Sequence, residues 1–185
     1  MSSMNADLVR EFVIAGHGNV VAVKSMLEAN PELLNASHEW RANDFETALQ
    51  AASHVGNREI ALHLLERGAS MTITTAAMLG DVAALEECLK LDQSLIHSSG
   101  AHGIPLLVHA VMSDNPALVS SLISRGAVSG ASMALNIAAD IGNLEVVRVL
   151  LTQTEPDLHW KNMKGKSSLE LAVGNPKLLE LLEVT

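Results

Sequence analysis

A pair of small residues recurs six times along the chain, and this repetition constrains the fold more than any other feature. The pair is Gly or Asp followed by Asn or Asp, and it occurs at 18–19, 56–57, 80–81, 114–115, 142–143 and 174–175. In the first five copies, apolar residues follow the second member of the pair at four, seven and eight positions. Because that spacing places the apolar side chains on one face of a helix, each pair predicts the start of an amphipathic helix.

The residues at the ends of these expected helices favour the same interpretation. Asn and Asp are common helix N-caps, since the side-chain oxygen accepts a hydrogen bond from a free backbone amide at the helix start. Pro116 and Pro176 each fall in a first turn, where no amide donor is required. Gly68 and Gly126 follow two of the helices, at the position where glycine adopts the left-handed conformation that ends a helix.

A second short segment with small residues at its centre precedes five of the pairs. These segments are 47–52, 74–77, 105–110, 134–139 and 167–172. Small side chains allow two helices to pack closely, so each unit is expected to be a helix, a tight turn and an antiparallel helix. One such unit cannot bury its own apolar face, but stacked units can. The chain is therefore predicted to be an all-α solenoid of about six stacked helix-turn-helix units.

These units resemble the ankyrin repeat, in which a Thr-Pro-Leu-His-x-Ala-Ala motif precedes a Gly-containing turn and a helix that ends in Gly-Ala. The best matches are residues 47–57, continuing to Gly68-Ala69, and residues 165–172. The resemblance covers the chain from about residue 8 to residue 183. Among ankyrin proteins, the chain is similar to compact bacterial ones. The resemblance implies one ankyrin-repeat domain over residues 1–185, with units at approximately 5–40, 41–70, 71–99, 100–128, 129–160 and 161–185.

The spacing of the units predicts which connections are long. Odd-numbered units start at about 9, 71 and 133, so the array also repeats as a two-unit module. A long connection follows each odd-numbered unit, whereas the even-numbered units restart quickly. Ankyrin repeats present a β-hairpin, called a finger, between units. The resemblance therefore predicts long β-hairpin fingers only after units one, three and five.

The resemblance also implies a function, because ankyrin domains bind protein partners through the finger tips and the concave groove. At the matching positions we expect finger contacts from Asn43, Asp44, Glu46, His102, Ile104, Met163, Lys164 and Lys166. We expect helix-end contacts from His54, Val55, Met78, Leu79, Met112, Asp140 and Ile141. Several of these side chains are apolar, which suits an adaptable recognition surface. The alternative is that neighbouring units cover them.

The two Trp residues are further candidate contacts with a partner. Trp40 and Trp160 both lie in finger segments of a chain with only 2% aromatic residues, and Trp is enriched at interface hot spots. The first finger is longer than the family pattern, which favours Trp40 and its neighbour Arg41 as contacts. Alternatively, each indole packs beneath its own hairpin.

The eight His residues raise a metal-dependent or catalytic alternative. His97, His102 and His109 lie close in sequence, near Asp114, and an imidazole can serve as a metal ligand or general base. Their spacing matches no established zinc motif, and no phosphate-binding loop, nucleophile elbow or paired-carboxylate motif is present. We therefore expect no enzyme activity, cofactor or metal, and keep a small-ligand or metal-dependent activity around these His residues as the alternative.

Composition limits the remaining classes. The 48% of hydrophobic residues favours a folded core over disorder. A net charge of −9 and the scarcity of aromatic residues argue against a nucleic-acid partner. The sequence also lacks the pattern of a signal peptide, a second Cys for an internal disulfide, and the roughly 20 apolar residues of a membrane span. We expect a monomeric cytoplasmic protein, and the sequence does not identify its partner.

Overall fold

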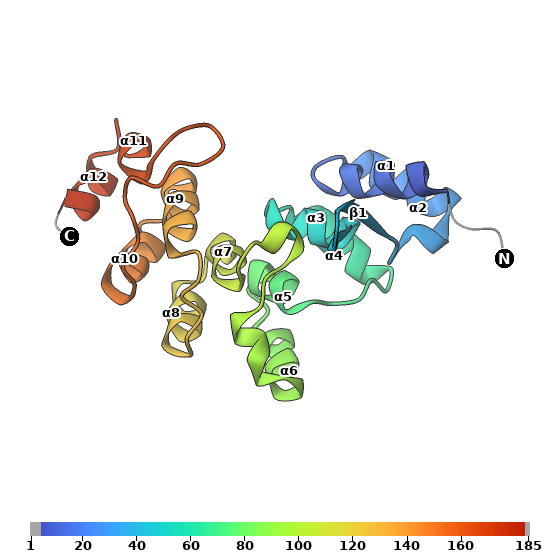
Figure 1. Ribbon diagram of the computed structural model, residues 1–185, viewed down its shortest axis with the longest axis horizontal. Helices are drawn as coiled ribbons and strands as arrows, with labels where there is room; N and C mark the ends of the chain where they lie inside the picture. Colours follow the sequence, from blue (N-terminus) through green and yellow to red (C-terminus); the bar gives the residue numbers. More distant parts are fainter. Residues whose placement is uncertain (1–4, 184–185) are drawn as a thin grey trace.

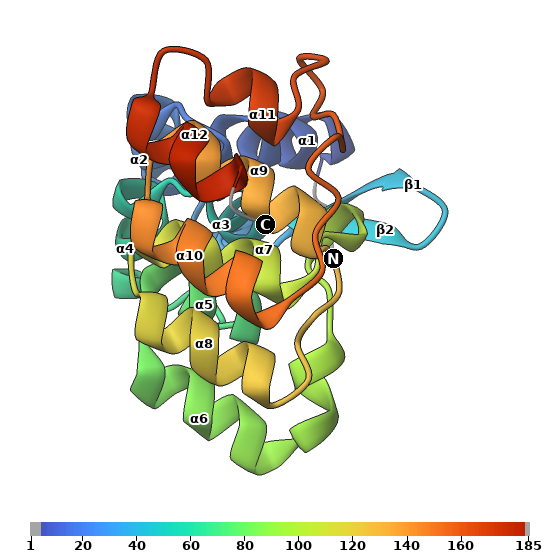
Figure 2. The ribbon, with the colours of Figure 1, turned by 90° about the vertical axis from the view of Figure 1, so that its left-hand side faces the viewer.

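A computed structural model describes residues 5–183, which form a curved stack of helix pairs (Figures 1 and 2). The inner row follows the concave edge and consists of α1 (Ala6–Gly16), α3 (Ala48–His54), α5 (Ile73–Leu79), α7 (Leu106–Ala110), α9 (Ala131–Ile141) and α11 (Ser168–Leu171). The outer row consists of α2 (Val20–Ala29), α4 (Arg58–Glu66), α6 (Val82–Leu91), α8 (Pro116–Ser124), α10 (Leu144–Gln153) and α12 (Pro176–Glu183). Each inner helix contacts the next, which confirms the predicted solenoid.

The recurring Asn or Asp residues begin the outer helices as predicted. The side-chain oxygens of Asn19, Asn57, Asp81, Asn115, Asn143 and Asn175 each accept a hydrogen bond from the backbone amide three residues later, at 3.0–3.2 Å. The preceding residue has a positive φ in five of the six copies, including Asp114 at 57°. The repeated pair is therefore the tight turn between the two helices of each unit.

The buried apolar residues form two clusters that meet at α5. The first contains Phe12, Val23, Leu64 and Met78, and the second extends from Ile73 to the last helix. Leu, Val and Ala supply most of both clusters, because closely stacked helices leave little space between them. None of the helices in the described part of the chain has the length and apolar character needed to cross a membrane.

Gly16 marks the closest approach of α1 to α3. A Cβ atom built at Gly16 would lie 2.6 Å from the carbonyl oxygen of Ala48 and 2.9 Å from its Cα, and backbone atoms cannot swing aside as a flexible side chain would. We expect Gly16→Ala to lower the free energy of unfolding by about 1–3 kcal/mol through overpacking, measured by urea titration. Gly18→Ala is the matched control, because a Cβ there meets no atom within 4 Å; equal losses in both variants would contradict this packing argument.

Only the first of the three long connections is a β-hairpin within residues 5–183. Strands β1 (Ser37–Arg41) and β2 (Asp44–Thr47) pair antiparallel, with an irregularity between Glu39 and Arg41. This first finger projects from the stack in Figure 2. The connection after α6 instead holds the short 3-10 helices η2 (Gln93–His97) and η3 (Ala101–Gly103) and one isolated bridge.

The expected hairpins after units three and five are absent for local reasons. His102 and Gly103 both have positive φ, which winds the segment after α6 into a turn in place of extended strands. In the segment after α10, Oδ1 of Asn162 accepts hydrogen bonds from the backbone amides of Lys164 and Lys166. The backbone amide of Asn162 also donates to the carbonyl oxygen of Lys166 at 3.0 Å, so this segment closes as one tight turn. Two further 3-10 turns, η1 (Pro31–Leu33) and η4 (Val111–Ser113), complete the described elements.

Candidate functional site

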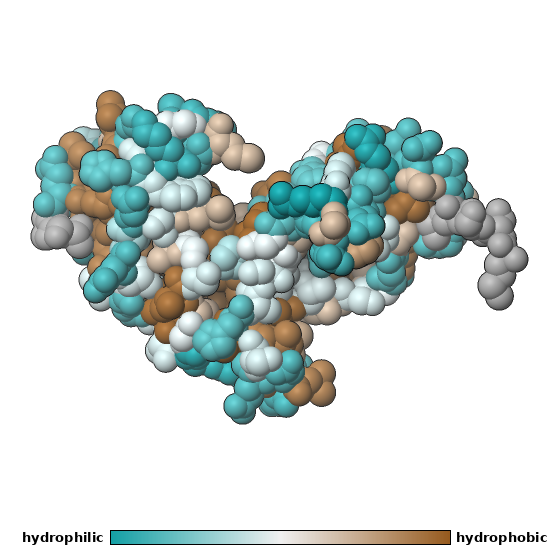
Figure 3. Space-filling view, viewed as in Figure 1, coloured by the Kyte–Doolittle hydropathy of each residue, from teal (hydrophilic) through white to brown (hydrophobic). Residues whose placement is uncertain are grey.

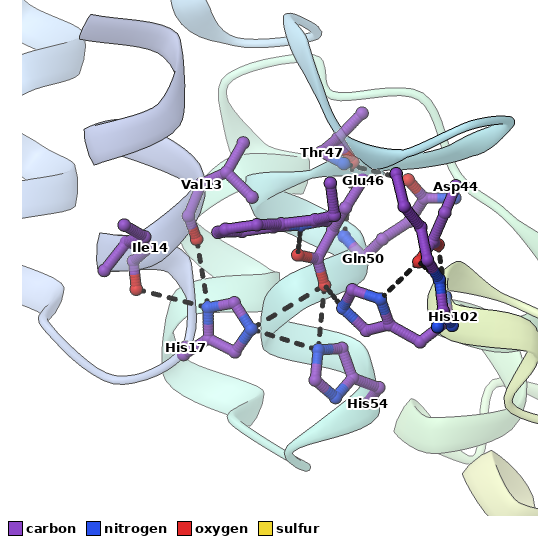
Figure 4. Close-up of polar contacts among 11 residues, drawn as sticks. Val13, Ile14, His17, Asp44, Glu46, Thr47, Gln50, His54 and His102 are labelled. Carbon is purple, nitrogen blue, oxygen red and sulfur yellow. Dashed lines mark hydrogen bonds and ion pairs between the residues drawn. The ribbon is translucent and has the colours of Figure 1, made fainter. Parts of the chain in front are cut away.

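Three imidazoles and one carboxylate converge beside the first finger (Figure 4). His17 follows α1, Glu46 lies on β2, His54 ends α3 and His102 is the middle residue of η3. These four residues, here called the His-Glu cluster, come from segments separated by up to 85 positions in the chain. They meet because α1 packs on α3 and β2, and because η3 packs on β2.

The convergence is centred on one carboxylate oxygen. Oε1 of Glu46 lies 2.8 Å from Nε2 of His54, 3.4 Å from Nε2 of His102 and 3.7 Å from Nε2 of His17. The Nε2 atoms of His17 and His54 are 3.1 Å apart. Glu46 is completely buried, whereas the three imidazoles retain partial exposure. The four atoms therefore face a common point at the edge of the protein.

Surrounding groups fix the orientation of three of these side chains. Nε1 of Trp40 donates to Oε2 of Glu46 at 2.7 Å, and Nδ1 of His102 donates to Oδ2 of Asp44 at 3.0 Å. Nδ1 of His17 donates to the carbonyl oxygens of residues 13 and 14 at 3.1 and 3.2 Å. Carbonyl and carboxylate oxygens only accept hydrogen bonds, so His17 and His102 each carry a proton on Nδ1. In their neutral forms, both imidazoles therefore present the Nε2 lone pair to Glu46.

The two carboxylates of this region are stabilised in their charged form. Burial raises the pKa of Glu46, but its contacts with His54 and Trp40 and the positive charge that His54 and His17 can carry outweigh burial, so the pKa lies below its ordinary value. Hydrogen bonds from the side chain and backbone of His102 lower the pKa of Asp44. Both groups are therefore anionic at neutral pH, in contact with nitrogen atoms that can bind a proton or a metal ion.

Comparison with known proteins identifies the architecture that holds this cluster. Residues 44–76 match the sequence model of the ankyrin repeat. An ankyrin repeat domain from Acinetobacter baumannii superposes with a TM-score of 0.52 over 94% of this chain and 96% of that domain, at 22% identity. The chain has the ankyrin-repeat fold. The human ASB11 ankyrin repeat domain has a TM-score of 0.50 over 98% of this chain and 87% of that domain, also at 22% identity. No match was found among curated protein sequences.

The sequence-predicted contact residues of this chain differ widely in exposure. Eight are exposed, namely Arg41, Asn43, Val55, Asp140, Ile141, Met163, Lys164 and Lys166. Another eight are half-buried, namely Trp40, Asp44, His54, Leu79, His102, Ile104, Met112 and Trp160. Glu46 and Met78 are fully buried, so a partner cannot reach their side chains in this structure. Met78 belongs to the first core cluster, against which Met112 also packs. This agrees with the alternative that neighbouring units cover such side chains.

The indole of Trp40 faces the protein. It hydrogen-bonds to Glu46, packs against the first core cluster and has the guanidinium of Arg10 5.8 Å from its ring centroid. These contacts match the alternative in which the indole packs against its own hairpin. The neighbouring Arg41 is largely exposed and pairs with Asp44 at 3.1 Å.

The structure does not bring His97 and His109 to the His-Glu cluster. His109 is buried in α7. His97 ends η2, and its ring lies against Gly126. Asp114 accepts a hydrogen bond from Asn143 at 2.6 Å. The arrangement therefore gives no support to a centre built from His97, His102 and His109. Of these three, only His102 faces Glu46.

His17 is the cluster residue that the sequence analysis missed. We predicted helix-end contacts at the two positions before the turns of units two to five, and the same rule applied to unit one would have selected residues 16 and 17. Glu46, His54 and His102 were predicted as contacts for a partner. Their convergence depends on how η3 docks against the first finger, and no local pattern encodes that docking.

Proposed function

We propose that this chain binds a protein partner through its finger tips and the concave edge of the inner helix row. The observation that carries the proposal is an exposed patch of mixed character at the end of α9. Ile141 is 59% exposed and Met163 is fully exposed, and their neighbours Asp140 and Lys164 form an ion pair at 3.8 Å. We call these four residues the α9 patch.

The α9 patch has the composition expected of a recognition surface. Exposed apolar side chains next to charged groups are typical of protein interfaces, where an apolar centre is surrounded by polar residues. Figure 3 shows the edge of the molecule indented between its two ends, and the stacked units of solenoids generally use such concave faces for binding.

The mechanism follows from the stacked architecture. The inner helices hold the exposed side chains in position before the partner arrives, so association loses little conformational entropy. On this proposal the chain acts by binding, as one ankyrin-repeat domain, and carries out no chemical step. Arg41 and Asn43, which are exposed on the first finger, and Lys166 in the loop after α10 would extend the contact surface beyond the α9 patch.

A matched pair of double variants tests this surface. We expect Ile141→Ser with Met163→Ser to reduce capture of a co-purifying partner at least about tenfold, which corresponds to roughly 1.4 kcal/mol of binding free energy. Quantitative affinity capture from cells expressing tagged protein measures the change. Leu91→Ser with Val21→Ser removes two exposed apolar side chains that lie on outer helices, away from the patch. The proposal fails if both double variants retain, or both lose, the same share of the captured partner.

A further inference from the structure

We infer that the His-Glu cluster binds one divalent transition-metal ion, with Zn²⁺ as the best-fitting ion. The ligands would be Nε2 of His17, His54 and His102 and Oε1 of Glu46, whose ligand atoms all lie within 4.8 Å of one another. This inference is independent of the proposed protein partner, because it depends only on groups within the chain.

The spacing of the four atoms suits a tetrahedral ion. Zinc bonds of about 2.0–2.1 Å in tetrahedral geometry separate neighbouring ligand atoms by about 3.3 Å. Oε1 of Glu46 lies 2.8, 3.4 and 3.7 Å from the three nitrogens, and two of those nitrogens are 3.1 Å apart. These distances fall on both sides of the ideal value. Small side-chain adjustments would therefore place all four atoms around one ion.

The hydrogen-bonding capacity of the cluster points to a cation. Since His17 and His102 carry their protons on Nδ1, the neutral cluster has at most one imidazole N–H facing its centre, that of His54. That proton has two nearby acceptors, Nε2 of His17 and Oε1 of Glu46. Nε2 of His102 and Oε1 of Glu46 face each other at 3.4 Å without a proton to share.

Glu46 shows the consequence of this shortage of donors. Its Oε1 atom is buried and receives no well-directed hydrogen bond, although three nitrogens lie within 3.7 Å. A buried anionic oxygen without a hydrogen bond is costly. One metal ion would satisfy this oxygen and the three imidazole lone pairs together, whereas protons alone would require at least one charged imidazole.

The groups around the cluster resemble the outer shell of a metal site. Metal-binding imidazoles generally donate their other N–H to a carboxylate or a backbone carbonyl. His102 donates to Asp44 in this way, His17 donates to two backbone carbonyls, and Trp40 holds the second oxygen of Glu46. Four protein ligands complete a tetrahedral shell, which is typical of structural zinc sites. The ion would therefore join α1, α3, the first finger and η3.

Direct metal binding by the full chain is the primary test. Protein freed of metal by a chelator, with the chelator then removed, is titrated with ZnCl₂ at neutral pH in competition with a chromophoric chelator. We expect one Zn²⁺ per chain, and a rise in the thermal midpoint of about 5–10 °C at a hundredfold excess over Kd. Co²⁺ should give the strong visible absorption of a tetrahedral complex. Failure of the wild-type protein to bind one equivalent would overturn the inference.

Matched variants locate the ion. His102→Gln should weaken Zn²⁺ binding at least about a hundredfold, and Asp44→Asn, which removes only the outer-shell carboxylate, about 10- to 100-fold. His159→Gln makes the same change at an exposed His outside the cluster and should bind as the wild type does. Circular dichroism identifies any variant that fails to fold, in which case the other variant decides. Undiminished binding by folded His102→Gln or folded Asp44→Asn would overturn the assignment. The inference would also be overturned if protonation of the imidazoles stabilised the protein while no metal ion bound.

Discussion

Leu150→Ala is expected to lower the free energy of unfolding by about 2–5 kcal/mol. Leu150 lies in α10, is completely buried and belongs to the second core cluster. Truncation removes apolar contacts and leaves a cavity that the stacked helices on both sides cannot close without separating from each other. Urea unfolding followed by circular dichroism measures the loss.

Two controls show whether this loss comes from burial. Leu91→Ala is the same substitution at the exposed end of α6. Lys164→Ala removes an exposed side chain of the loop after α10, whose ion pair with Asp140 spans 3.8 Å. Each should change the free energy of unfolding by no more than roughly 0.5 kcal/mol. A loss at Leu150 as small as in these controls would show that the assigned helix face is wrong.

Mild acid is expected to destabilise the protein through His109. Burial lowers the pKa of this imidazole to about 4, whereas an unfolded His titrates near 6.5. Between these values the unfolded chain binds a proton that the folded protein excludes, so stability falls as the pH drops from about 6.5 to 4. Because one pKa unit corresponds to about 1.4 kcal/mol, the total loss is about 3 kcal/mol.

The difference between wild type and His109→Leu isolates this contribution. Leu fills much of the same buried volume and does not titrate, so the variant should lose the His109 part of the pH dependence while keeping that of the other groups. Glu46 and Asp44, whose pKa values are lowered in the folded protein, affect stability at lower pH. Each carboxylate's contribution to stability is lost only as the pH falls below its unfolded pKa of 4.5 or 3.8. Urea titrations at pH 7, 6 and 5 give the difference in stability. A difference that stays constant with pH would contradict the assignment.

The helical part of the fold could be predicted because its determinants are local. Asn57 and Asn143 cap the helices they precede, and the apolar residues that follow need only the helical repeat to face the core. The conformation of the connection after α6 could not be predicted in the same way. It depends on a left-handed His102, a conformation that few non-glycine residues adopt and that here accompanies two hydrogen bonds to Asp44 on a distant segment.

The candidate site was predicted only in part, for a related reason. Glu46, His54 and His102 were selected because their positions in the repeat are usually accessible to a partner. The structure places them around one point, where Glu46 is buried and accepts a hydrogen bond from Trp40 on its second oxygen. Position in a repeat indicates which edge of the stack a residue occupies. It does not indicate that η3, in the connection after α6, will pack against the first finger.

The contact between η3 and the first finger changes how the stack can come apart. In a simple solenoid each unit interacts only with its neighbours, so terminal units can detach one at a time. Here unit three is short and has no finger before it, and His102 at the start of unit four reaches Asp44 at the start of unit two. Loss of unit two therefore breaks contacts with unit four as well as with unit three. The first four units are coupled beyond nearest neighbours, and this end of the array should open as one cooperative block.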